Sequence, residues 1–176
     1  MIAAIPRPSI LRAAALALAG LLLAACYETS AEIIPPDQAI SLTDLPGSYS
    51  GSDGAETEIA AIAFSNDYRF RRVTADNEQT VGTIRIMPLT GDIYVVQMAD
   101  DDDSAYTILF YRFSSDQNGT GFSRVTPAAT DEQLVALAAS HGATYDPDFA
   151  VLEGPAATQL AFVLAHAELP FTTADE

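Results

Sequence analysis

The densest group of potential metal ligands in the chain is an uninterrupted run of four acidic residues. The run consists of Asp100, Asp101, Asp102 and Asp103. Clustered carboxylates are hard oxygen ligands that suit Ca²⁺. An EF-hand loop starting at Asp100 would need Gly at position six and Glu at position twelve, where this chain has Ala105 and Tyr111. We therefore interpret the run as a solvated acidic turn and keep it only as a weak Ca²⁺ candidate, with no metal site assigned.

Three arginines could form a second kind of site, one that binds an anion. Arg69 and Arg71 alternate with apolar residues in the run 67–73, and Arg85 lies in the run 80–87. If these runs pair through a loop around 75–79, Arg69 falls opposite Arg85, with Arg71 on the same face. Opposed like charges are unfavourable unless carboxylates or a bound anion lie between them. Salt bridges to the protein's own acids are the favoured interpretation, and a carboxylate or phosphate site is the alternative.

Catalytic motifs are not found in the sequence. The two histidines, His141 and His166, fall near the ends of expected helices, where they can bond the last carbonyl groups. There is no HExxH or CxxC pattern and no second cysteine, so a zinc centre is not indicated. We expect no catalytic residue and no cofactor, and we predict a non-enzymatic protein.

The first 26 residues have the anatomy of an export signal. Arg7 and Arg12 are the only charges before an apolar run from Ala13 to Leu22, which is shorter than the roughly 20 residues needed to span a bilayer. Leu23-Ala24-Ala25-Cys26 follows directly. This tetrapeptide, in this context, resembles the lipobox of bacterial lipoproteins.

The resemblance implies that residues 1–25 are removed and that Cys26 carries a diacylglycerol thioether with acyl chains such as palmitate. Cys26 is the only cysteine, so no disulfide can form within the chain. The alternative is an ordinary secretory signal or an uncleaved anchor, with Cys26 an incidental thiol. Position 27 is Tyr and not the Asp that retains enteric lipoproteins in the inner membrane. The resemblance therefore favours the outer membrane, with the domain facing the periplasm or the cell surface.

Charge excludes one class of partner. All 24 acidic residues but only six of the eight basic ones follow Cys26, so the processed chain has a formal charge of −18. Such a charge repels the phosphates of nucleic acids and anionic lipid surfaces, so a DNA, RNA or membrane-surface role is not expected.

The pattern after Cys26 predicts a single α+β domain. Residues 26–44, with acids and two adjacent prolines, are interpreted as a lipidated N-terminus and flexible tether, and residues 45–176 as the domain. Period-two alternation predicts an antiparallel β meander of about six strands, at 56–64, 67–73, 80–87, 93–98, 106–113 and 121–125. Two C-terminal helices should then pack on the sheet: one from the Thr130 to Gln133 capping box to Gly142, and one starting at Pro155.

These features lead to two hypotheses about function. The first is a lipid-anchored cell-envelope protein that presents a small acidic domain for interaction or assembly, with the membrane and an envelope protein as its partners. The second is a small-molecule-binding module with a pocket between sheet and helices, lined by Tyr106, Ile108 and Phe110.

Overall fold

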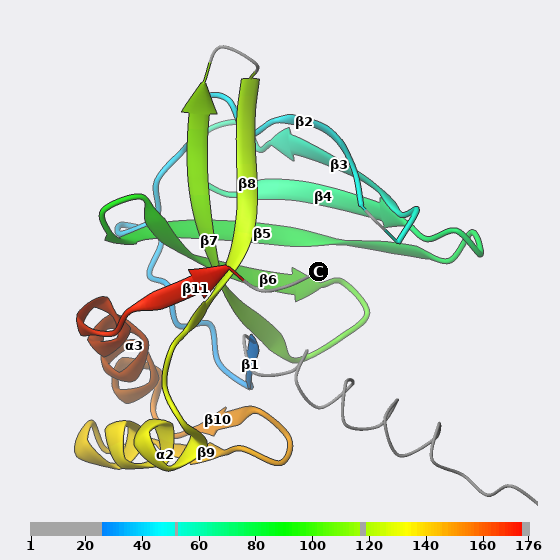
Figure 1. Cartoon of the computed structure of the whole chain (residues 1–176). Coiled ribbons are helices and arrows are strands. Elements are labelled where there is room, and N and C mark those ends of the chain that lie inside the picture. Colours follow the sequence, from blue (N-terminus) through cyan, green and yellow to red (C-terminus); the bar gives the residue numbers. More distant parts are fainter. Residues whose placement is uncertain (1–25, 52, 117–118, 174–176) are drawn as a thin grey trace, which may run out of the picture.

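The computed structural model describes residues 26–51, 53–116 and 119–173 (Figure 1). The predicted signal peptide, with Leu23, Ala24 and Ala25 of the lipobox, lies outside the described residues. The strands are β1 (Cys26–Thr29), β2 (Gly47–Ser50), β3 (Glu56–Ala61), β4 (Tyr68–Val73), β5 (Gln79–Thr90), β6 (Ile93–Asp100), β7 (Tyr106–Asp116), β8 (Gly119–Pro127), β9 (Thr144–Asp146), β10 (Val151–Glu153) and β11 (Phe171–Thr173). The helices are α2 (Asp131–Ser140), α3 (Ala156–Ala165) and the 3₁₀-helix η1 (His166–Glu168).

The described residues form a mixed α/β fold with one sheet of eleven strands and two α-helices. Strands β2 to β8 pair in sequence order, each antiparallel to the next, so the predicted meander is present. The prediction of about six strands was too low. Strands β1, β2, β9, β10 and β11 have three or four residues each, which is too short for a period-two pattern to reveal.

The two apolar faces of the meander pack into separate clusters, because successive residues of a strand point to opposite faces. The inner cluster consists of Leu45, Ile59, Tyr68, Phe70, Ile84, Ile86, Val96 and Leu109. It fills the concave side of a curled sheet, in which β7 and β8 cross β3 to β5 at a steep angle (Figure 1). The rings of Tyr49 on β2 and Phe122 on β8 lie 4.8 Å apart, so the two ends of the meander meet there.

The helix-side cluster occupies the other face. It consists of Tyr27, Ile33, Ile34, Ala39, Met87, Ile93, Val95, Ile108, Phe110, Val125, Leu134, Ala138, Ala143, Tyr145, Ala150, Leu152, Phe162 and Val163. The α2 capping box is confirmed: Gln133 N–H donates to Thr130 Oγ1 at 3.3 Å, and Thr130 N–H donates to Gln133 Oε1 at 2.9 Å. Gly142 ends the helix with φ +75°, which glycine adopts without strain. No helix among the described residues is long and apolar enough to cross a membrane.

The segment expected to be a flexible tether is part of the fold. β1 lies inside the sheet, antiparallel to β7 and parallel to β10. Residues 30–45, which we call the strap, then cross the sheet, with Ile33 and Ile34 buried in the helix-side cluster and Leu45 in the inner cluster. Burying these apolar side chains offsets the entropy lost on ordering the segment. The folded domain therefore includes β1 and the strap and does not start near Leu45.

Candidate functional site

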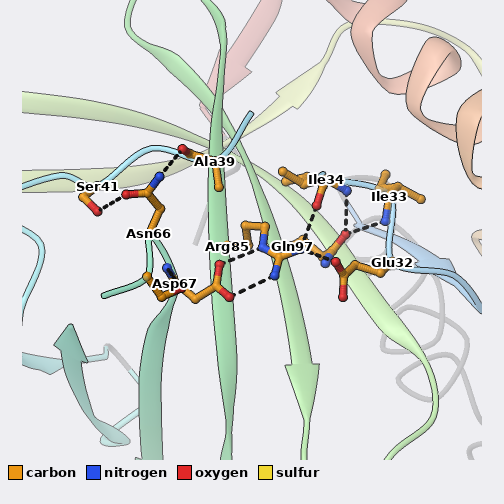
Figure 2. A network of polar contacts seen from close by, with 10 residues as sticks. Glu32, Ile33, Ile34, Ala39, Ser41, Asn66, Asp67, Arg85 and Gln97 are labelled. Atoms are coloured by element: carbon orange, nitrogen blue, oxygen red, sulfur yellow. Dashed lines mark hydrogen bonds and ion pairs between the residues drawn. The ribbon is translucent and has the colours of Figure 1, made fainter. Parts of the chain in front are cut away.

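The strap is held by a polar network around Arg85, which is only 13 % exposed (Figure 2). Arg85 Nε donates to Asp67 Oδ1 at 2.7 Å and Nη2 to Oδ2 at 2.9 Å, a bidentate pair. Nη1 donates to the Ile34 carbonyl at 2.8 Å and to the Glu32 carboxylate. Hydrogen bonding to Arg85 lowers the pKa of Asp67, and the same bond raises the pKa of Arg85. Arg85 thus ties the strap to the start of β4.

Two amide side chains complete the network. Gln97, buried on β6, accepts the backbone N–H groups of Ile33 and Ile34 with its Oε1, at 2.8 and 3.0 Å. Asn66, in the β3–β4 turn, donates to the Ala39 carbonyl at 2.8 Å and accepts from Ser41 Oγ at 2.9 Å. These bonds pair backbone N–H and C=O groups of the strap, which is not paired along its length with a strand. Buried backbone groups of this kind need hydrogen-bond partners.

The structure does not place Arg85 directly opposite Arg69. β4 and β5 pair with Arg69 opposite Thr83, so Arg85 lies beyond Tyr68, the first residue of β4, and the expected Arg69 to Arg85 pairing is wrong. The hairpin loop spans residues 74–78 and closes one residue earlier than expected, which moves each partner by two positions.

Two of the three arginines bind carboxylates of the protein itself. Arg69 pairs with Asp101, with Nη1 and Oδ1 2.9 Å apart, and Arg85 pairs with Asp67 and Glu32. Arg71 is exposed opposite Glu58 and forms no ion pair with any residue that the structure describes. An anion bound across the group would have to displace carboxylates already in place.

The four consecutive aspartates connect β6 to β7. Asp100 ends β6 opposite Gly82, Asp101 binds Arg69, and Asp103 Oδ1 accepts the Ala105 N–H at 3.1 Å. Desolvation raises the pKa of Asp100, and the neighbouring aspartates raise it further. Across residues 26–51, 53–116 and 119–173, no three His, Cys, Asp or Glu side chains are grouped so that they could hold a metal ion.

A buried tyrosine–histidine pair was not foreseen. The Tyr27 hydroxyl and His166 Nε2 lie 2.7 Å apart, and His166 Nδ1 lies 2.9 Å from the Phe162 carbonyl. A carbonyl only accepts, so Nδ1 carries the proton and Nε2 accepts from Tyr27. Burial lowers the pKa of His166 to about 4 and raises that of Tyr27, so both are neutral at physiological pH.

This pair is enclosed by aromatic rings. Phe110 stacks on His166 at 5.2 Å between ring centroids, and Phe162 meets it edge-on at 4.6 Å. Tyr27 and His166 are both 0 % exposed. A substrate has no access to them, and we interpret the pair as a structural lock between β1 and the end of α3. The ring bond to the Phe162 carbonyl is the helix-end role expected for His166.

The interface between sheet and helices, where a ligand pocket was predicted, is filled. Ile108 and Phe110 are both 0 % exposed in the helix-side cluster, against Phe162 and Val163. An open cleft of about 380 Å³ lies instead where the strap meets β6 and β7. It is lined by Ser41, Leu42, Thr43, Asp44, Leu45, Tyr94, Phe113 and Ser114. The rings of Tyr94 and Phe113 meet edge-on there at 5.0 Å.

Comparison of the chain with models of protein families, with curated proteins and with solved structures found no match.

Proposed function

We propose that the protein is a non-enzymatic, lipid-anchored cell-envelope protein, attached through Cys26, that presents a small acidic domain for interaction or assembly. Its partners would be the membrane, through the acyl chains, and a protein of the envelope. The residue after Cys26 favours the outer membrane. The formal charge of −18 after Cys26 disfavours nucleic acid as a partner.

The observation that carries the proposal is the lipobox-like Leu23-Ala24-Ala25-Cys26 behind a charged and apolar leader. Two or more acyl chains make anchoring stable, at about 0.8 kcal/mol for each buried methylene.

The test is to express the full chain in a bacterium that processes lipoproteins and to measure the mass of the protein purified from membranes. We expect a chain that starts at Cys26, carries acyl mass and floats with vesicles. The Cys26→Ser variant should keep its leader or appear in the soluble fraction. A natural product that starts elsewhere, or that has no acyl mass, would refute the proposal. Affinity capture of the processed protein from its own envelope then identifies the protein partner.

The open cleft supports a second candidate function, a small-molecule-binding module. Two aromatic rings and several hydroxyl groups line this open cleft of about 380 Å³ and can contact a small ligand on one side. Native mass spectrometry of the protein purified from its own envelope should then show one bound small molecule. The Tyr94→Ser variant should lose this molecule while keeping its fold. Recovery of the protein with its native Tyr94 but without a bound small molecule would argue against this candidate.

A further inference from the structure

The proposed anchor and the fold are separated by no spacer. Cys26 is the first residue of β1, and the next residue, Tyr27, is 0 % exposed between β7 and β10. One extended residue spans only about 3.3 Å. Acyl chains on Cys26 would therefore hold this part of the fold against the bilayer instead of letting the domain swing on a tether.

An exposed phenylalanine lies beside this attachment point. β1 and β10 are parallel, and Glu28 lies opposite Val151, the first residue of β10. Cys26 is two residues before Glu28, and Phe149 is two residues before Val151. The Glu28 N–H donates to the Ala150 carbonyl at 2.9 Å, which fixes this alignment. Phe149 is 74 % exposed, whereas Ala150, directly after it, is buried.

Local interactions within the β9–β10 turn fix the conformation of the segment that carries Phe149. Asp146 Oδ1 accepts the Asp148 N–H at 2.9 Å, which makes a closed local turn between β9 and β10. Ala150 has φ +54°, a left-handed conformation that is costly for alanine. The fold thus exposes the aromatic ring of Phe149 to water, at a position where a smaller or polar residue would expose less apolar surface.

We propose that Phe149 inserts into the interfacial region of the bilayer next to the acyl chains on Cys26, as a second membrane contact that fixes the orientation of the domain. This inference rests on the proposed lipid anchor. Aromatic rings are favoured at the boundary between headgroups and acyl chains. Asp146 and Asp148 flank the ring and would be repelled by anionic headgroups, so the partner is a zwitterionic lipid surface.

Phe64 provides a matched control. It is another exposed phenylalanine in a hairpin turn, and its φ of +62° resembles that of Ala150. Its turn joins β3 to β4, in the upper half of Figure 1, whereas β1, β9 and β10 lie in the lower half. An aromatic residue at this position should stay in water when the protein is on a membrane.

The chain has no tryptophan, so one introduced indole is a unique fluorescent probe. We would produce the Phe149→Trp and Phe64→Trp variants as full chains, purify the lipidated proteins and reconstitute them in zwitterionic vesicles. On vesicles, the indole at 149 should shift its emission to shorter wavelength and be quenched by brominated lipids. The indole at 64 should keep its emission and remain open to an aqueous quencher. Vesicles enriched in anionic lipid should reduce the shift at 149.

The outcomes separate this inference from the proposed function. If both proteins carry acyl chains and float with vesicles but both indoles stay in water, the inference is wrong and the anchor stands. Equal lipid quenching at 149 and 64 also overturns it, because the orientation would not be fixed. If neither protein carries acyl mass, the proposed function fails first, and the inference fails with it.

Discussion

The buried Tyr27–His166 pair predicts that the domain loses stability in mild acid. The pKa of His166 is lowered from 6.5 to about 4 in the folded protein, chiefly by desolvation. Between these values the unfolded chain binds a proton that the folded chain does not. Stability is therefore fully present above about pH 6.5 and is lost as the pH falls towards 4.

The size of the effect follows from the same two pKa values. The full shift corresponds to about 3 kcal/mol, and the part lost between about pH 7.5 and about pH 5 is about 2 kcal/mol. A small domain has a total stability of only about 5 to 15 kcal/mol, so a loss of this size is readily measured.

The assay is urea unfolding of residues 26–176 at the two pH values, followed by far-UV circular dichroism. The His166→Gln variant is the key comparison, because a carboxamide offers a donor and an acceptor but does not titrate in this range. Its free energy of unfolding should change by about 2 kcal/mol less between the two pH values than that of the parent. The His141→Gln variant, which replaces the other histidine, should behave as the parent does.

The comparison between variants also removes the contribution of carboxylates. The pKa of Asp67 is lowered by Arg85, so its contribution is lost in acid as well, whereas the pKa of Asp100 is raised by desolvation and acts in the opposite direction. Both groups remain in the His166→Gln variant. The reasoning is refuted if parent and His166→Gln lose the same stability between the two pH values.

Three further predictions concern the fold. Gly82→Ala places a Cβ 2.1 Å from the Ala99 carbonyl oxygen and should cost about 3 kcal/mol in urea unfolding; an unchanged midpoint would contradict this. Thr130→Ala removes the α2 cap and should cost about 1 kcal/mol, whereas Thr130→Ser should cost much less, and equal losses would show that the cap does not act. Arg85→Met leaves Asp67 without its partner and should lower the free energy of unfolding by about 3 kcal/mol. It should also speed proteolysis within the strap, and an unchanged cleavage rate there would show that the network does not hold the strap in place.

Sequence patterns were most informative where local chemistry decides the structure. The α2 capping box needs only Thr130 and Gln133, three residues apart, and it was predicted correctly. The long strands of the meander alternate over six or more residues and were also found. The strand predicted at 80–87 ends before Pro88, but β5 continues through Pro88 to Thr90, with a register irregularity between these two residues. A bulge of this kind accommodates a residue that has no N–H to donate.

The parts that escaped prediction depend on distant partners. In β1, Tyr27 and Thr29 are buried and Glu28 is exposed, a period-two pattern in a strand of only four residues. The pair Pro35-Pro36 and the acids nearby outweighed it and suggested a tether. A pocket was expected between sheet and helices, but that interface is filled and the open cleft lies where the strap meets β6 and β7. The sequence does not show that the meander curls until Tyr49 reaches Phe122.

The place of β1 between β7 and β10 also affects how the chain folds. Its partners are Tyr106 to Leu109 and Val151 to Leu152, which follow it by roughly 80 and 120 residues. Contacts between such distant segments are slow to form, because a long loop must close first. A nascent chain cannot complete the sheet until its last third has been made. Delayed completion of this kind would suit the export that we propose, in which the polypeptide crosses a membrane before it folds.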